Sequence, residues 1–495
     1  MNAPERTIDL DQVRIDPAWA LRIPVTLALR RRVLPFAMLK KCVYVACLDV
    51  NDTASLDAVA RYTNCEVAPI RVEPEPLQRA LSRVYGDGRG RSAAAARTEP
   101  GEPSGDDAVG LGEELLRAAV MRQASDIHID PSREDVRIRL RVDGVLEEYR
   151  RLSASVHAAL CSRIKVMSGM DIAERRAPQD GAFTYQYGAQ ERNHAIDVRV
   201  ASLPTKYGER MTLRLLAAQD QLLTLERLGM NGRDLDAMER MLAQPHGLVL
   251  LTGPTGGGKT TTLYAAIRGL LAQAPYNIIT VEDPVEYEIP GVAQVEVDSA
   301  DKVSFQKALR SLLRHDPDVL VIGEIRDLDS LDVATKASLT GHLVFSTLHT
   351  NNAASVITRL IDMGMPAHLI GATLRLCVAQ RLVRKLCTHC RRAVPLPASQ
   401  ALALGIPATE EGTTVFEAEG CLYCAGRGFA GRMGLFECAT IDNDLASLIA
   451  RGVNESDLVV ALNRKGFHTL LQDGADKVLG GFTTVQEVLN AVTEY

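Results

Sequence analysis

Residues 247–262 constrain the fold more than any other part of the chain. The apolar run 247–252 predicts a buried strand, and it leads directly into GPTGGGKT at 253–260, which has the spacing G-x4-G-K-T. The next residues, 261–267, predict a helix. Strand, glycine-rich loop and helix in this order form a phosphate-binding loop, in which backbone N–H groups and a helix N-terminus face an anion. The segment therefore predicts a nucleotide site on an α/β sheet.

The loop also predicts the ligands of that nucleotide. Lys259 is expected to bridge the β- and γ-phosphates, and Thr260 to hold Mg²⁺. The expected nucleotide-binding residues of the loop are Gly253, Pro254, Thr255, Gly256, Gly257, Gly258, Lys259, Thr260 and Thr261.

Carboxylates follow two apolar runs downstream of the loop. The run at 277–281 precedes Glu282 and Glu286, and the run at 318–323 precedes Glu324. Ligands of parallel sheets lie outside the carboxyl ends of the strands, so these acids are candidates for the site. Glu324 is the candidate that orients or deprotonates the attacking water. From spacing alone, Glu282 and Glu286 fit a turn cluster as well as a catalytic one.

Histidines stand on both sides of a third apolar run. His342 precedes the run at 343–348, and His349 follows it. His349 is a candidate sensor of the γ-phosphate. A core histidine with satisfied hydrogen bonds is the alternative.

Arginines share faces of several predicted elements. Strict alternation over 136–142 predicts a strand with one apolar face and one arginine face. Two later strand-like segments carry Arg199 and Arg214, and a helical stretch places Arg310 and Arg314 four residues apart on one face. A solvated surface is the simplest interpretation, and a surface that faces phosphates is the alternative.

Four of the ten cysteines form two CxxC pairs, Cys387 with Cys390 and Cys421 with Cys424, separated by 30 residues. Two tight turns that each supply two thiolates suit tetrahedral zinc. Four thiolates leave no position for water, so a structural zinc is expected. The other six cysteines stand in mostly apolar contexts and are expected to be small buried side chains.

Length and charge limit the classes of protein. A chain of 495 residues is expected to hold about three domains. Acidic residues outnumber basic ones by 62 to 56, which argues against a general nucleic-acid binder. No apolar run approaches the ~20 residues of a membrane-spanning helix, and the first residues lack a secretory signal. We expect a cytoplasmic protein that reaches a membrane only through partners.

Several motifs are shared with one group of ATPases. They are ASDIHIDP at 124–131, APQDG at 177–181, LPTKYGER at 203–210, the loop at 253–260, VEDPVEY at 281–287, GEIRD at 323–327, the histidine box at 341–352 and AQRLVRKLC at 379–387. On these motifs the chain resembles the secretion ATPases of type II secretion and type IV pili. Within that superfamily it most resembles the E-component (GspE) family of type II secretion.

The resemblance implies a multidomain α/β fold in several parts. It implies a small α/β partner-docking domain, an α+β PAS-like second domain that closes over nucleotide, and a RecA-like P-loop ATPase domain with a zinc-binding insert. Composition shifts and the resemblance together place these at 1–88, 106–217 and 218–495, with a linker at 89–105 and the tetracysteine insert at 386–425.

The resemblance also implies an activity and an assembly. We expect an ATP hydrolase that uses ATP, Mg²⁺ and a structural Zn²⁺, forms a homohexamer, and powers pseudopilus assembly. The implied partners are the cytoplasmic domain of the inner-membrane secretion component L (GspL) and the platform component F, so the protein would be peripheral on the inner membrane. The implied roles are a catalytic glutamate at Glu324, an acid box at Glu282 and Glu286, a histidine box at His342 and His349, and charge neutralisation by Arg199, Arg214, Arg310 and Arg314.

Three other functions stay open from the sequence. A type IV pilus extension ATPase shares the same core and cysteine insert. A nucleotide-gated scaffold would bind ATP with little turnover. A DNA translocase is disfavoured by the charge balance.

Overall fold

The computed structural model describes residues 8–85, 108–187, 194–216, 224–297, 305–406 and 413–493. These divide into two compact units. Unit 1 holds residues 1–218 together with 387–391 and 418–430, and unit 2 holds 219–386, 392–417 and 431–495. The linker expected at 89–105 lies outside the described residues. Within the described part of the chain, no helix has the length and apolarity to cross a membrane.

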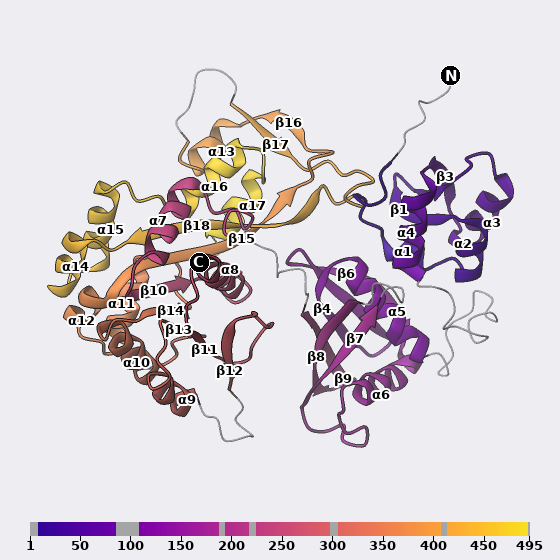
Figure 1. Cartoon of the computed structure of the whole chain (residues 1–495). Helices are drawn as coiled ribbons and strands as arrows, with labels where there is room; N and C mark the ends of the chain where they lie inside the picture. The colour runs from indigo at the N-terminus through magenta and orange to yellow at the C-terminus, as the bar shows by residue number, and fades with distance from the viewer. Residues whose placement is uncertain are drawn as a thin grey trace. The chain divides into compact units, whose positions relative to one another are not determined.

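Unit 1 begins with a small α/β fold around a three-stranded sheet (Figure 1). The middle strand, β2, pairs antiparallel with the first and parallel with the third. Asp52 begins the helix that connects the parallel pair, because its carboxylate accepts the N–H of Ser55. The elements are α1 (Pro17–Ala20), α2 (Val25–Arg31), β1 (Leu34–Leu39), β2 (Cys42–Cys47), α3 (Thr53–Thr63), β3 (Glu66–Arg71) and α4 (Pro74–Tyr85).

The second part of unit 1 is a six-stranded antiparallel sheet in the order β6-β5-β4-β9-β8-β7, with α5 and α6 packed on its apolar face. The alternation predicted for 136–142 is confirmed: Val136 and Ile138 are buried, whereas Arg137 is exposed. The elements are α5 (Ala108–Met121), β4 (Ala124–Pro131), β5 (Asp135–Val142), β6 (Val145–Ser153), η2 (Ala154–Val156), α6 (His157–Met167), β7 (Gln179–Tyr187), β8 (His194–Thr205) and β9 (Gly208–Leu216).

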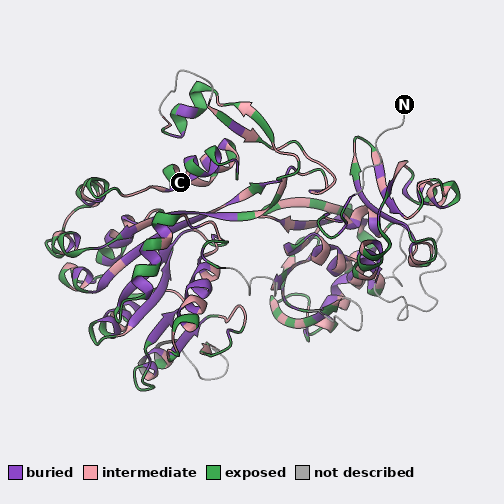
Figure 2. Ribbon diagram, turned by 45° about the horizontal axis from the view of Figure 1, so that its top comes forward, coloured by how far each residue is buried: buried purple, intermediate pink, exposed green. Residues whose placement is uncertain are grey.

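Unit 2 is built on a seven-stranded sheet in the order β12-β11-β13-β14-β10-β15-β18, in which the first six strands run parallel. Successive residues of β10 face two separate cores. Leu248 and Leu250 pack with residues of α9 to α12, whereas Val249 and Leu251 pack with residues of α7 and α8. The central strands β10, β11, β13 and β14 are therefore buried on both faces, as the purple ribbons of Figure 2 show, whereas the edge strand β12 is partly exposed. This burial explains the continuous apolar runs of the central strands.

The elements of the sheet and its covering helices are α7 (Gly232–Leu242), β10 (Gly247–Thr252), α8 (Lys259–Gln273), β11 (Ile278–Glu282), β12 (Val292–Glu296), α9 (Phe305–Leu312), β13 (Val319–Ile322), α10 (Leu328–Leu339), β14 (Leu343–Leu348), α11 (Ser355–Asp362), α12 (Ala367–Thr373), β15 (Leu374–Leu386) and β18 (Phe429–Thr440). The remaining elements are β16 (Arg392–Pro395), α13 (Ala398–Ala403), β17 (Thr414–Glu417), α14 (Asn443–Ala450), α15 (Glu455–Arg464), α16 (Leu470–Leu479) and α17 (Val485–Thr493).

One helix is shorter than the sequence predicts. The periodicity over 305–315 predicts that Arg310 and Arg314 share a helix face, but α9 ends at Leu312 and Arg314 lies in the turn beyond it. Pro317 limits the helix, because in a continued helix its ring would clash with the carbonyl oxygen of residue 313.

Candidate functional site

The loop between β10 and α8 packs directly against β15. Gly253 and Gly258 have φ angles of 148° and 84°, which favour glycine. A Cβ on Gly253 would lie 2.4 Å from the carbonyl oxygen of Gln380, and a Cβ on Gly258 would lie 2.8 Å from Nε2 of Gln380. Glycine at both positions therefore allows the loop to curve around an anion while it stays in contact with β15.

The strand–loop–helix arrangement predicted from the sequence is confirmed. The other predicted nucleotide ligands lie along the same loop and in the first turn of α8. They are Pro254, Thr255, Gly256, Gly257, Thr260 and Thr261.

Lys259 is a buried cation at the N-terminus of α8. Only 7% of the residue is exposed, and its Nζ donates to the carbonyl oxygens of Gly253, at 2.7 Å, and Pro254, at 3.0 Å. Burial lowers the pKa of Lys259 to about 8, while the Glu324 carboxylate raises it and the Arg381 guanidinium lowers it. An anion in the loop would favour the charged ammonium, because an opposite charge within a few ångströms stabilises the ionised form.

Parallel strands bring the predicted side chains to one edge of the sheet. Lys259 begins the helix after β10, Glu282 ends β11, Glu324 follows β13 and His349 follows β14. Because β13 pairs with β14 and β14 with β10, all in parallel, Glu324 and Lys259 lie at the same edge of the sheet. This edge is where ligands of parallel α/β sheets bind.

Glu324 is held by two cationic or hydrogen-bonding partners. Its Oε1 accepts from Nε of Arg326, and its Oε2 lies 3.2 Å from Nε2 of His349. Burial raises the pKa of Glu324, but Arg326 and His349 outweigh that effect and hold the pKa below its usual value. The side chain is 27% exposed, so the carboxylate is only partly buried.

The segment that carries His349 is itself fixed to the strand before the loop. The N–H of Thr350 donates to Oγ1 of Thr252 at 2.7 Å, and that hydroxyl lies 3.0 Å from the carbonyl oxygen of Thr350. Because Thr252 ends β10, this contact ties the position of His349 to that of the loop.

Glu282 differs from Glu324 in its surroundings. Only 4% of Glu282 is exposed, and it accepts hydrogen bonds from the Tyr264 hydroxyl, from Oγ1 of Thr280 at 2.6 Å and from Nε2 of Gln294 at 3.2 Å. These neutral donors fix the carboxylate in place. Glu286 lies beyond the strand, and its N–H donates to the same Tyr264 hydroxyl at 3.4 Å.

The two histidines of the histidine box are not brought together. His342 precedes β14 and His349 follows it, so the six residues of the strand separate them by about 20 Å. The Nδ1 of His342 lies 2.9 Å from the carbonyl oxygen of Ala337 and 3.0 Å from Oγ1 of Thr340. His342 therefore caps the end of α10, at the edge of the sheet opposite the phosphate-binding loop.

The predicted arginines lie in different parts of the chain. Arg199 and Arg214 are direct cross-strand partners in β8 and β9 of unit 1, and Nε of Arg214 lies 3.1 Å from Asp126. In unit 2, Arg314 is exposed and its Nη2 donates to Oγ of Ser311 at 3.4 Å. Arg310 lies in α9, and its side chain lies outside the described residues.

Three residues of the site were not singled out from the sequence. Arg326 contacts Glu324 and also lies 3.3 Å from Asp283 through its Nη1. Gln380 accepts from Oγ1 of Thr262 at 2.8 Å, and Arg381, which is 5% exposed, lies beside the loop. These residues stand in the GEIRD motif at 323–327 and the AQRLVRKLC motif at 379–387. Membership of these motifs was the sequence signal that could have identified them.

The four paired cysteines form one cluster in unit 1. The Sγ atoms of Cys387 and Cys421, of Cys390 and Cys424, and of Cys421 and Cys424 are each 3.8 Å apart, and all four lie within 4.8 Å of one another. These separations far exceed a disulfide bond of about 2.05 Å. Backbone N–H groups of Cys421 and Gly428 donate to Sγ of Cys424 at 3.2 and 3.1 Å, which suits a thiolate.

The cluster has the dimensions of a zinc site. A tetrahedron of thiolates about 2.3 Å from a central zinc has edges of about 3.8 Å. The observed sulfur separations match that edge, so the four cysteines fit a structural zinc ion.

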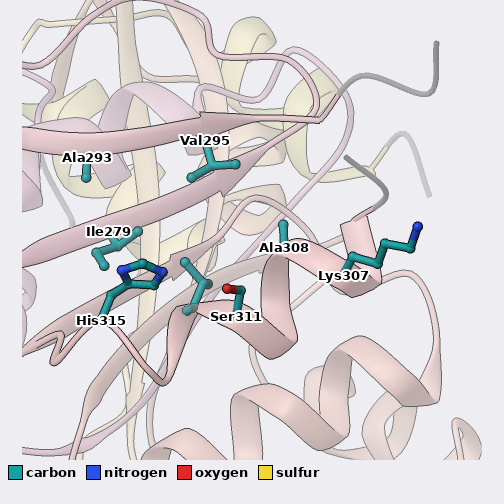
Figure 3. Close-up of a pocket in the computed structure, with 8 residues that line it drawn as sticks. Ile279, Ala293, Val295, Lys307, Ala308, Ser311 and His315 are labelled. Atoms are coloured by element: carbon teal, nitrogen blue, oxygen red, sulfur yellow. The ribbon is translucent and has the colours of Figure 1, made fainter. Parts of the chain in front are cut away.

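A separate pocket of about 420 Å³ lies between β11, β12 and α9 (Figure 3). Ile279, Ala293 and Val295 form its apolar wall, and Lys307 and His315 are among the residues of the helical side. None of the described residues that line it is a carboxylate. The pocket therefore offers none of the acid groups found at the loop edge.

Comparison with family models matches two parts of the chain. Residues 108–490 match the family described as "Type II/IV secretion system protein", and residues 3–91 match the family described as "MshEN domain".

Curated relatives extend this similarity. A type II secretion system protein E of Klebsiella pneumoniae is 46% identical over 380 residues, which cover 77% of this chain and 74% of the relative. A type II secretion system protein E of Pseudomonas aeruginosa is 38% identical over 508 residues, with 99% of both chains covered. The type IV pilus assembly ATPase PilB of Thermus thermophilus is 36% identical over 502 residues, covering 98% of this chain and 56% of the relative.

Two solved structures share the fold. The ATPase DotB of Legionella pneumophila has a TM-score of 0.60 at 21% identity and covers 80% of this chain and 98% of its own. The pilus retraction motor PilT with bound ADP has a TM-score of 0.50 at 25% identity and covers 76% of this chain and 96% of its own. The expected multidomain α/β ATPase fold is thereby confirmed.

Proposed function

Because the chain belongs to the type II/IV secretion system protein family, we propose that it is the ATP-hydrolysing motor of a type II secretion system. The observation that carries this proposal is the placement of Lys259 and Glu324 at one edge of a parallel sheet. The choice of the type II secretion branch over the pilus branch is supported by a relative named for type II secretion, which aligns over 99% of both chains.

In the proposed mechanism the loop binds the phosphates of ATP. Backbone N–H groups of Gly256 to Lys259 face the phosphates, and the Lys259 ammonium exchanges its two loop carbonyls for phosphate oxygens. Thr260 would hold Mg²⁺, which supplies neutralisation of the phosphate charge. Glu324 orients the attacking water and takes its proton, because its carboxylate is ionised and lies at the same edge.

Arg326 and His349 position the Glu324 carboxylate, and buried Glu282 holds the end of β11 in place. A second copy of the chain completes the site in this proposal. Arginines of the second domain and of the segment around α9 would add positive charge at the phosphates. These are Arg199, Arg214, Arg310 and Arg314.

We propose that the chain acts as a homohexamer with four functional parts. The N-terminal domain docks onto the cytoplasmic domain of component L, the second domain closes over nucleotide, and the RecA-like domain transmits the motion toward platform component F at the inner membrane. Zinc holds the tetracysteine insert. The proposed boundaries are 1–88, 106–217 and 218–495, with the linker at 89–105 and the insert at 386–425.

The first experiment measures turnover of Mg-ATP by the purified full chain. Glu324→Gln removes the base and is expected to lower kcat by about 10²-fold or more. Glu239→Gln, which changes an exposed acid of α7, is the matched control and is expected to keep the wild-type rate. Equal rates for the wild type and Glu324→Gln would remove Glu324 from the mechanism, and little turnover by either chain would favour a nucleotide-gated scaffold.

A second experiment distinguishes secretion from pilus assembly. Pilus assembly is the alternative function, because the similarity to PilB covers 98% of this chain. The chromosomal copy is replaced by Glu324→Gln, and exported proteins are compared with surface pili on the same cells. Loss of export with pili intact supports the secretion motor. Loss of pili with export intact would transfer the same chemistry to the pilus branch.

A further inference from the structure

The residues around the four cysteines cluster with unit 1, although both flanking stretches of chain belong to unit 2. We call residues 387–391 and 418–430 the cysteine knuckle. The knuckle forms one compact unit with residues 1–218, whereas residues 219–386, 392–417 and 431–495 form the other unit. The knuckle therefore has partners of its own in the N-terminal half of the chain.

One partner of the knuckle is the N-terminal α/β domain. Leu422 and Tyr423 pack against the apolar core of that domain, and the N–H of Arg14 donates to the carbonyl oxygen of Tyr423 at 3.0 Å. Gly426 lies beside β1, where an added Cβ would be 3.6 Å from Cδ2 of Leu39. Apolar packing and a backbone hydrogen bond thus hold the two together.

A chain of charges connects the knuckle, the six-stranded sheet and the N-terminal domain. Nη2 of Arg427 lies 2.8 Å from Glu147 of β6, and Glu147 lies 3.8 Å from Nη1 of Arg122. Nη2 of Arg122 in turn lies 2.6 Å from Asp16 at the start of α1. The Arg122 and Arg427 side chains are only 11% and 19% exposed, so salt screens these pairs less than it screens surface pairs.

A second ion pair joins the N-terminal domain to the same sheet. Nη1 of Arg14 lies 2.8 Å from Asp143 in the turn between β5 and β6, and both side chains are 12% exposed. The N–H of Arg14 is the group that contacts Tyr423, so this one residue touches both the knuckle and the sheet.

The docking residues are built into the metal-binding turns. Leu422 and Tyr423 are the two residues between Cys421 and Cys424, and His389, between Cys387 and Cys390, stacks on the Tyr423 ring with centroids 3.8 Å apart. We propose that the cysteine knuckle is the docking site for the N-terminal domain, and that metal binding by the four cysteines keeps Leu422 and Tyr423 in the conformation that docks.

The test is hydrogen–deuterium exchange on the full chain. Leu422→Ala with Tyr423→Ala removes the docking side chains and keeps all four cysteines. Exchange at residues 12–16 and 36–41 is expected to rise about tenfold or more, because the docked state no longer protects these amides. Leu402→Ala, which truncates a leucine of α13 that is 81% exposed, is the matched control and is expected to leave exchange there unchanged.

Two controls show that the double variant is folded and loaded. Metal analysis is expected to give one zinc per chain, and the fluorescence of Trp19, the single tryptophan, reports the N-terminal domain itself. Chelation of zinc from the wild-type chain is the second arm, and it is expected to raise exchange in the same two segments. Unchanged exchange in the double variant would overturn the docking site. Release in the double variant without release on chelation would overturn the role of the metal.

Discussion

The phosphate-binding loop offers a direct test of why its glycines are needed, because two of them have different surroundings. Gly256 has a φ of 76° and no atom within 4 Å of an added Cβ. Gly253 has a φ of 148°, and a Cβ there would lie 2.4 Å from a carbonyl oxygen of β15. Gly256→Ala therefore introduces backbone strain alone, whereas Gly253→Ala adds a collision with the sheet.

The expected costs follow from those surroundings. Left-handed backbone costs a residue with a Cβ about 1–2 kcal/mol, so Gly256→Ala should lower the free energy of unfolding by that amount. Gly253→Ala adds overpacking of about 1–3 kcal/mol to strain of about 1–3 kcal/mol, because buried β15 cannot move away. With about 2–4 °C per kcal/mol, Gly256→Ala should lower the melting temperature by about 2–8 °C. Gly253→Ala should lower it by about twice as much or more.

Calorimetry of the nucleotide-free chain measures these shifts, and titration with nucleotide measures the Kd. Gly341→Ala is the control for strain, because Gly341 has a φ of 101° with open space around it and lies before β14. Gly341→Ala should lower the melting temperature about as much as Gly256→Ala does, and it should leave the Kd for nucleotide unchanged. Gly253→Ala should weaken nucleotide binding about tenfold or more, a loss of ~1.4 kcal/mol. Equal melting shifts in all three variants would refute the argument that β15 constrains the loop.

Three further outcomes follow from the charged groups. Arg326→Gln removes a cation that lowers the pKa of Glu324, so the acid limb of the ATPase pH profile should move to higher pH; an unmoved limb would contradict this. Lys165 and Glu209 form a buried ion pair, so Lys165→Met leaves the Glu209 carboxylate buried without its cation. This variant should lower the free energy of unfolding in urea by about 3–5 kcal/mol, and adding Glu209→Leu should restore most of that loss. Burial and nearby Asp473 raise the pKa of Asp234 to about 6, so stability falls as pH rises from about 4 to 6, by ~3 kcal/mol. Asp234→Asn should therefore raise the melting temperature at pH 8 and change it little at pH 4, and equal shifts at both would exclude this ionisation.

Local patterns predicted the elements that hold the site. The apolar runs before the loop, Glu282, Glu324 and His349 are strands, because strands covered on both faces need continuous apolar sequence. Acids that end such strands must meet at one edge, so the position of Glu324 near Lys259 follows from spacing and topology. The same logic places His342, which precedes its strand, at the opposite edge.

Contacts between distant segments could not be read from those patterns. The apposition of Gln380 to the loop depends on β15 pairing with β10, more than 100 positions earlier in the chain. The partners of the cysteine knuckle are more distant still, since Arg427 meets Glu147 across 280 positions. The CxxC spacing indicates that four thiolates converge, but it carries no information about which surface the turns between them contact.

The contacts of Glu324 suggest how nucleotide binding would be coupled to catalysis if Glu324 acts as the proposed base. Oε1 of Glu324 accepts from Arg326 and Oε2 faces His349, so both carboxylate oxygens have partners. The Lys259 ammonium likewise donates its hydrogen bonds to two carbonyl oxygens of the loop. In the proposed site, a phosphate bound by Lys259 would add negative charge at this edge of the sheet, and we expect it to compete with the Glu324 carboxylate for the Arg326 guanidinium. Glu324 would then keep His349 as its orienting partner and gain a free oxygen for water, so we expect nucleotide binding to make the proposed base more available.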